Sequence, residues 1–281
     1  MPVVRIGKDK QHAIYLLRGE ANTWLGIRSK AHALSRYSVI EPETLQGLIL
    51  ADSTSGDSHY FDVLLPKRAN WKQALFDRAN RIKGFDIHFP YPPSGETGDE
   101  FICPDSFWTE CATNPDRLDQ EESHFRSFTI NFLQDIVYPG CVIYDPACST
   151  GSFSGYLKAS LPQCIVLASD ASLSMTQAAK NQIDRAFVCD ALRPALRDNS
   201  CDVLICRFLN HEVMTTTLAN KILSKMVPLI KHNGKIIIFG HTPILIDIPR
   251  ISQKYGMTLT SSLAHSEIPN GLFQYYIVGF H

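Results

Sequence analysis

The sequence predicts an α/β protein with a mostly parallel sheet, an antiparallel strand at its C-terminal end, and an irregular α+β region at its N-terminus. From about residue 116 onward, short apolar runs alternate with helical patterns, which is typical of a parallel sheet covered by helices. Before that point the patterns are irregular, and residues 89–100 are rich in Pro, Gly and acidic side chains, as in a linker or loop. We therefore expect an N-terminal region over residues 1–115 and a second domain over 116–281.

The elements of the second domain follow in a regular order. Apolar runs suited to buried parallel strands cover residues 141–144, 164–168, 186–189, 201–206 and 235–239. Helical patterns cover residues 117–137, 152–160, 172–181, 217–230 and 249–255. Ser172 is the expected N-cap of the third helix, and 232–234 reads as a turn. A final strand pair is expected over 259–264 and 274–280. In the N-terminal region, 12–17 predicts a strand, whereas 42–51 and 71–82 predict helices.

Composition excludes several classes of protein. Hydrophobic residues make up 44% of the chain and charged residues 20%, which is ordinary for a globular protein. The formal net charge of −1 indicates no general attraction to a nucleic-acid backbone. No apolar run approaches the roughly 20 residues that span a bilayer, and the N-terminus lacks the apolar core of a secretory signal. None of the eight cysteines forms a C-x-x-C pair, so we expect reduced thiols in a cytoplasmic protein.

The most informative stretch is residues 142–153, Val-Ile-Tyr-Asp-Pro-Ala-Cys-Ser-Thr-Gly-Ser-Phe. An apolar strand ends in Asp145, a loop of small residues follows, and a helix begins after Gly151. Ligands of open parallel sheets bind beyond the carboxyl ends of the strands. Small residues let the backbone approach such a ligand closely, and the helix N-terminus favours an electron-rich group.

This stretch resembles the first motif of class I, Rossmann-like S-adenosylmethionine-dependent methyltransferases, an acid-x-Gly-x-Gly-x-Gly pattern after the first strand. Asp145 and Gly151 match the ends of the motif, and Ala147 and Ser149 replace its first two glycines. The resemblance covers about residues 116–281 and implies S-adenosyl-L-methionine as cofactor. It places the methionine part of the cofactor against Asp145, Ala147, Cys148, Ser149 and Gly151.

Two further acids stand after the next two strands. Asp170 follows the second strand, 25 residues after Asp145, where an acid can accept hydrogen bonds from both ribose hydroxyls. Asp190 follows the third strand, and the resemblance assigns it to the adenine amino group. The neighbours Ala171 and Ala191 belong to the same expected site. We expect the three carboxylates to converge on one cofactor.

Arg207 and Phe208 follow the fourth strand, where the resemblance places the lining of the methyl-donor pocket. A surface charge and a core aromatic are an equally weighted interpretation of this pair. The competing use of the fold, a nicotinamide dehydrogenase, requires G-x-G-x-x-G, whereas the loop here has a single Gly. The Asn/Asp-Pro-Pro-Tyr/Phe motif of DNA adenine methyltransferases is also absent after the fourth strand.

The stretch Asn210-His211-Glu212 is similar to the His-Asp pair of small-molecule O-methyltransferases. His211 is the predicted general base with Glu212 beside it, because a His can take a proton near neutral pH. The alternative is a capping His and a solvated Glu. A metal bound by His211, Glu212 and either His265 or His241 is a second alternative, but we predict no metal.

We therefore expect an S-adenosylmethionine-dependent methyltransferase that acts on a small-molecule metabolite at an oxygen, a nitrogen or an enolate carbon. A protein or nucleic-acid methyltransferase and a non-catalytic cofactor-binding module are the rival hypotheses. We expect no membrane partner, and a homodimer stays open. The N-terminal region is expected to cover the active site or to dimerise. Aromatic side chains that could line a substrate pocket, or form plain core, are Trp71, Phe85, Tyr91, Phe107 and Trp108.

Overall fold

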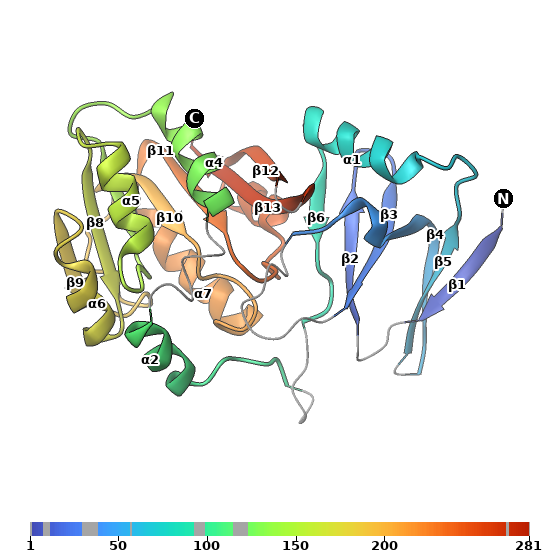
Figure 1. Cartoon of the computed structure of the whole chain (residues 1–281), viewed down its shortest axis with the longest axis horizontal. Coiled ribbons are helices and arrows are strands. Elements are labelled where there is room, and N and C mark those ends of the chain that lie inside the picture. The colour runs from blue at the N-terminus through green and yellow to red at the C-terminus, as the bar shows by residue number, and fades with distance from the viewer. Residues whose placement is uncertain are drawn as a thin grey trace.

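The chain forms two β-sheets that lie side by side, each with its own helices (Figure 1). The computed structural model describes residues 2–7, 12–29, 39–56, 58–92, 99–114, 123–267 and 270–280. The C-terminal sheet has seven strands and the N-terminal sheet has six. Part of the predicted helix over 117–137 lies outside the described residues.

The seven-stranded sheet has the order β12-β13-β11-β10-β7-β8-β9. Its strands are β7 (Val142–Asp145), β8 (Ile165–Asp170), β9 (Arg185–Val188), β10 (Cys201–Cys206), β11 (Ile230–Phe239), β12 (Thr258–Glu267) and β13 (Asn270–Gly279). The pairs from β9 to β11 are parallel, whereas β13 runs antiparallel to both β11 and β12. The predicted mostly parallel sheet with an antiparallel C-terminal strand is therefore confirmed.

Helices cover both faces of this sheet. They are α4 (Ser123–Gln134), α5 (Ser152–Ser160), α6 (Leu173–Ala179), α7 (Thr216–Met226) and α8 (Ile248–Lys254). The first three pack with side chains such as Ile143 on one face, and α7 and α8 pack with side chains such as Tyr144 on the other. Successive residues of a strand point to opposite faces, so each short apolar strand supplies both cores.

Two predictions for the connection between β10 and β11 need correction. The predicted helix over 217–230 ends at Met226, and a short 3₁₀ turn over Val227–Leu229 carries Pro228, which cannot continue the hydrogen-bonding pattern of the helix. The predicted turn at 232–234 lies inside β11, where the register between β10 and β11 shifts. A bulge in one strand absorbs these residues.

The N-terminal sheet is antiparallel, with the order β1-β5-β4-β3-β2-β6. Its strands are β1 (Val3–Gly7), β2 (His12–Arg18), β3 (Thr23–Ser29), β4 (Leu45–Ser55), β5 (Ser58–Leu64) and β6 (Asp86–His88). Helix α1 (Trp71–Arg81) matches its prediction and packs on one face through Leu75, Phe76 and Ala79. The helix predicted over 42–51 is wrong, because only Pro42–Thr44 forms a 3₁₀ turn and β4 follows at once, paired with β3 and β5. Pairing on both sides outweighs the local helical pattern.

The two sheets meet where β6 runs beside β12 and β13. The Tyr276 hydroxyl donates to Asp86 Oδ1 at 2.9 Å, and Gln274 Nε2 donates to the carbonyl oxygen of Ile87 at 2.9 Å. The backbones of Ile40 and Leu272 exchange two further hydrogen bonds. Buried polar groups therefore join the two halves, whereas the boundary between residues 115 and 116 stays a prediction.

Candidate active site

The loop after β7 is shaped by backbone conformation and by close packing against α6. Gly151 caps α5 with a φ of +86°, and a Cβ placed there would lie 2.5 Å from Ala179 Cβ. Ser149 also has a positive φ, of 54°. Only glycine adopts such a φ readily and leaves room for the neighbouring helix, so Gly151 sets the path of the loop.

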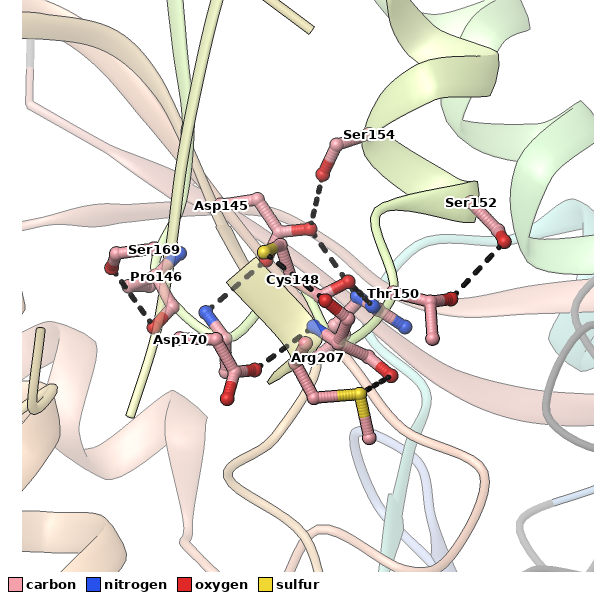
Figure 2. Close-up of polar contacts among 12 residues, drawn as sticks. Asp145, Pro146, Cys148, Thr150, Ser152, Ser154, Ser169, Asp170 and Arg207 are labelled. Carbon is pink, nitrogen blue, oxygen red and sulfur yellow. Dashed lines mark hydrogen bonds and ion pairs between the residues drawn. The ribbon is translucent and has the colours of Figure 1, made fainter. Parts of the chain in front are cut away.

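Asp145 lies beneath this loop and is fully buried. Its Oδ2 accepts hydrogen bonds from Ser154 Oγ at 2.7 Å and from Arg207 Nε at 3.3 Å (Figure 2). Arg207 Nη2 also donates to the carbonyl oxygen of Cys148 at 2.8 Å, and the guanidinium lies over the Phe153 ring. Asp145 thus holds Arg207 in place, and Arg207 in turn holds the loop through the carbonyl oxygen of Cys148.

Asp170 ends β8 and holds two turns of backbone. Its Oδ2 accepts from the Ser149 N–H and its Oδ1 from the Ser172 N–H, both at 2.9 Å. Burial raises the pKa of the Asp170 carboxyl above its usual value, although these two N–H groups oppose the shift. Ser172 caps α6 as predicted, because its side chain accepts from the Met175 N–H. The carboxylate therefore stands in a fixed position at the tip of the strand.

Asp190 follows β9 and is more exposed. Its Oδ1 accepts from the Leu192 N–H at 2.8 Å, which closes a short turn. Since β8 and β9 are neighbours in the sheet, Asp170 and Asp190 stand at adjacent strand ends.

One cavity of about 350 Å³ opens at these strand ends. Of the residues predicted for the cofactor, those that border it are Ala147, Ser149, Asp170, Ala171, Asp190, Ala191, Arg207 and Phe208. Further apolar lining comes from Met175, Val213, Met214, Leu218 and Ile222. Two carboxylates, a guanidinium and an apolar wall therefore face the same space, which suits a ligand with both polar edges and a flat apolar body.

Five predicted site residues are not among those that border this cavity. Asp145, Cys148 and Gly151 support the loop from behind. His211 and Glu212 are both buried, with His211 Nε2 4.0 Å from Glu212 Oε1. Their role as catalytic base and partner stays a prediction.

The alternative metal ligands are dispersed. His265 Nε2 is hydrogen-bonded to Asn270 Oδ1 at 2.8 Å near the turn between β12 and β13, whereas His241 borders the cavity. In the described part of the chain, no three His, Cys, Asp or Glu side chains gather in a way that could hold a metal ion.

The segment over residues 99–114 contributes Trp108 to the lining of the cavity. Glu100 Oε2 accepts from the backbone N–H of Thr216 at 2.6 Å, and the Cys103 N–H donates to the carbonyl oxygen of Glu212 at 2.7 Å. Helix α2 (Asp105–Thr113) follows and presents Trp108, on which Phe107 packs edge-on. Of the other aromatic candidates, Phe85 is buried in the core between the N-terminal sheet and α1.

Sequence reasoning missed several lining residues. Leu218 and Ile222 are four residues apart in α7, so they share one face of the helix, and Met214 lies just before the helix begins. That spacing is typical of plain core, and nothing in it distinguishes a cavity wall. Asn210 also borders the cavity, although the sequence drew attention to its neighbours His211 and Glu212.

The chain is similar to several known proteins. Residues 144–238 match the family described as a methyltransferase domain. The isonocardicin synthase of Nocardia uniformis subsp. tsuyamanensis is 27% identical over 243 residues, which cover 86% of this chain and 79% of that protein. A tRNA (carboxymethyluridine(34)-5-O)-methyltransferase of Macaca fascicularis is 28% identical over 100 residues, 36% of this chain and 14% of that protein. A TehB-like methyltransferase structure from Corynebacterium glutamicum aligns with a TM-score of 0.49 and 14% identity over 63% of this chain and all of the other.

Proposed function

Because the chain belongs to the class I, Rossmann-like S-adenosylmethionine-dependent methyltransferases, we propose that it methylates a small-molecule acceptor at an oxygen, a nitrogen or an enolate carbon. The observation that carries the proposal is that Asp170, Asp190 and Arg207 border the same cavity. Its volume of about 350 Å³ lies in the range typical of small-molecule sites. No helix within the described residues has the length and apolarity to cross a membrane.

The residues of the cavity fit the cofactor. The carboxylates of Asp170 and Asp190 are acceptors suited to the ribose hydroxyls and the adenine amino group. The side chains of Leu218 and Ile222 offer an apolar surface for the adenine ring, and the loop at Ala147 and Ser149 leaves room for the methionine part. When bound, the cofactor supplies an electrophilic methyl group on a sulfonium.

The chain's own contribution is mainly to align and enclose the reactants. Methyl transfer depends on in-line placement of the acceptor atom, and fixed positions such as that of Asp170 reduce the entropy lost in reaching it. Trp108 from α2 lines the cavity, where its bulky aromatic side chain would displace water from a bound ligand. His211 as a general base is a further proposal. If His211 is the base, His211→Gln should lower kcat and remove its fall at acidic pH. If His211 is only structural, the substitution should lower the melting temperature and leave the shape of the pH profile unchanged.

Calorimetry with S-adenosylhomocysteine tests the cofactor site. We expect Asp170→Ala to weaken binding by at least ~100-fold, because two hydrogen bonds from hydroxyls to a carboxylate are lost. Asp184→Ala is the matched control. Asp184 accepts from the Val166 N–H at 2.8 Å and pairs with Lys158, but it lies at the opposite end of β8. Equal losses in both variants would contradict the assignment.

The transferred group and the acceptor class are tested with a methyl-labelled donor. Label incorporated from a small-molecule extract, with S-adenosylhomocysteine as co-product, supports the proposal. Label in tRNA or protein alone would favour the rival methyltransferase class. Release of 5′-methylthioadenosine would show that another carbon of the sulfonium is attacked, which would contradict methyl transfer. Tight binding without turnover would favour a non-catalytic module.

We also propose a cytoplasmic location. All eight cysteines are free thiols, and Cys148 and Cys206 are fully buried. Burial raises the pKa of both thiols, which makes them unreactive and typical of a reducing compartment.

A further inference from the structure

Asn210 follows β10 and borders the cavity with only 3% of its surface exposed. Its Nδ2 donates to Thr242 Oγ1 at 2.6 Å and to the carbonyl oxygen of His211 at 3.3 Å. Both donor positions of the amide are therefore used inside the protein. The other end of the amide, Oδ1, is buried and accepts no hydrogen bond from any described residue.

The orientation of this amide is fixed by its neighbours. The Thr242 hydroxyl donates to the same His211 carbonyl oxygen, so its lone pairs face Asn210 Nδ2. Rotating the amide by 180° would place Oδ1 against two acceptors. Oδ1 is therefore held as an acceptor on the remaining side, and a buried acceptor without a donor is costly.

Gly240 makes room for this arrangement. A Cβ at position 240 would lie 2.7 Å from Asn210 Cβ and 2.8 Å from Asn210 Cγ. The ends of β10 and β11 thus fit together around the amide, and the glycine lets Asn210 sit against the turn that carries Thr242. The backbone and side chains around Asn210 therefore fix both its position and the orientation of its amide.

The position of Asn210 in the sheet indicates which ligand it meets. In the strand order, β10 lies two strands away from β8, which carries Asp170 at its end. Neighbouring strands are about 4.8 Å apart, so the end of β10, which Asn210 follows, lies roughly 10 Å along the sheet from the end of β8. His241, after β11, borders the cavity still further along the strand order. The part of the cavity beyond the methyl donor is where the acceptor must enter.

We propose that Asn210 determines acceptor specificity: its Oδ1 accepts a hydrogen bond from an O–H or N–H of the methyl acceptor. The inference rests on the proposed methyl transfer. It restricts the acceptor to molecules that present a hydroxyl, amine or amide to this position, and it disfavours a carboxylate there, because two acceptors would repel each other. The ammonium of the donor's amino-acid part is the other source of such an N–H.

Three binding probes separate the two sources without a known acceptor. Sinefungin carries an amine where the donor carries its methyl group, so its N–H groups point toward the acceptor. S-adenosylhomocysteine has no group there, and 5′-methylthioadenosine lacks the amino-acid part. Each is titrated by calorimetry into wild type, Asn210→Leu and the control Asn220→Ala, a change on the exposed side of α7.

We expect Asn210→Leu to weaken sinefungin binding by ~10- to 100-fold and to leave the other two probes within about threefold of wild type. Weaker binding of both amino-acid-bearing probes, with 5′-methylthioadenosine unchanged, would assign Oδ1 to the donor's ammonium and overturn the acceptor role. Equal weakening of all three, or of none, would also overturn it. If Asn210→Leu does not fold, Asn210→Ala is read by the same criteria. Failure of wild type to bind any probe would instead contradict the proposed function itself.

Discussion

The two sheets differ in how their strand ends are arranged, and therefore in whether loops and side chains gather at one edge. In the C-terminal sheet the parallel strands end together, so that the loops after β7, β8, β9, β10 and β11 border one cavity. In the N-terminal sheet neighbouring strands run in opposite directions, and their ends alternate between the two edges. Parallel strands concentrate polar side chains at one edge, whereas antiparallel strands disperse them. The second half therefore forms most of the cavity, to which the first half contributes Trp108.

The largest effect we expect concerns the contact between the sheets. Burial raises the pKa of Asp86 to about 7, although the Tyr276 hydroxyl and the nearby Arg18 lower it. The folded state therefore binds a proton that the unfolded state releases above about pH 4. The stability from this group is complete at low pH and is lost as the pH rises through 7. Asp86→Asn should therefore be more stable than wild type by roughly 1.5 kcal/mol at pH 5 and by as much as about 4 kcal/mol at pH 8.

Urea unfolding at the two pH values measures this difference. The substitution keeps an oxygen that can accept from Tyr276, so packing changes little. A difference between the two proteins that does not vary with pH would show that Asp86 does not lose its proton at the contact.

The next effect lies inside the C-terminal half. Gly151→Ala should lower the free energy of unfolding by about 2–4 kcal/mol, because its Cβ would overlap Ala179 and its φ is positive. Gly140→Ala is the control, since Gly140 has a similar φ of +83° but nothing within 4 Å of an added Cβ. We expect it to cost about 1 kcal/mol. Equal losses in thermal or urea unfolding would mean that close packing of the loop on α6 is unimportant.

A smaller effect tests whether the N-terminal half covers the cavity. Trp108→Ala should weaken S-adenosylhomocysteine binding by roughly tenfold, since a large aromatic side chain would leave the lining. Phe107→Ala removes the neighbouring ring that packs on Trp108 without itself bordering the cavity, so it should have a lesser effect. If both variants bind as wild type, the second half alone forms the binding site.

The smallest effect concerns the hydrogen bonds between Glu100 and Thr216, which hold residues 99–114 near the start of α7. Glu100→Gln weakens the hydrogen bonds that Thr216 donates from its N–H and its hydroxyl at the start of α7. A carboxylate at a helix N-terminus contributes at most about 1 kcal/mol, so we expect that loss in urea unfolding and at most a threefold change in cofactor affinity. A tenfold loss of affinity would mean that this contact is required to position residues 99–114 for cofactor binding.

The sequence predicts the C-terminal sheet well because each of its strands is recognisable by itself. Buried parallel strands such as residues 201–206 are short, continuous apolar runs, and β10 has those bounds. The N-terminal sheet depends on pairing between distant segments. Residues 45–55 form β4 because β3 and β5 flank them, and no local pattern contains that information.

The candidate site was predictable to the extent that it follows the strand ends. Asp170 and Asp190, which follow neighbouring strands, border one cavity together with Arg207, and their roles toward the cofactor stay predictions. Asp145 lies behind the cavity because Ser154 and Arg207 take up its carboxylate, which only three-dimensional contacts reveal. Trp108 comes from the other half of the chain, where the sequence offered it as one of five aromatic candidates and could not distinguish a pocket wall from plain core.

The side chain of Gln274 sets a condition on recombining this protein with its relatives. Its Oε1 accepts from the Ile244 N–H at 2.8 Å, and its Nε2 donates to the carbonyl oxygens of Ile244 and Ile87. The side-chain amide of Gln274 thus both accepts and donates hydrogen bonds to backbone groups, as a peptide group does. A chimera with a foreign N-terminal half should therefore present a backbone carbonyl at the place of Ile87, because without it the Gln274 amide keeps only the Ile244 carbonyl oxygen and the Tyr276 hydroxyl as acceptors.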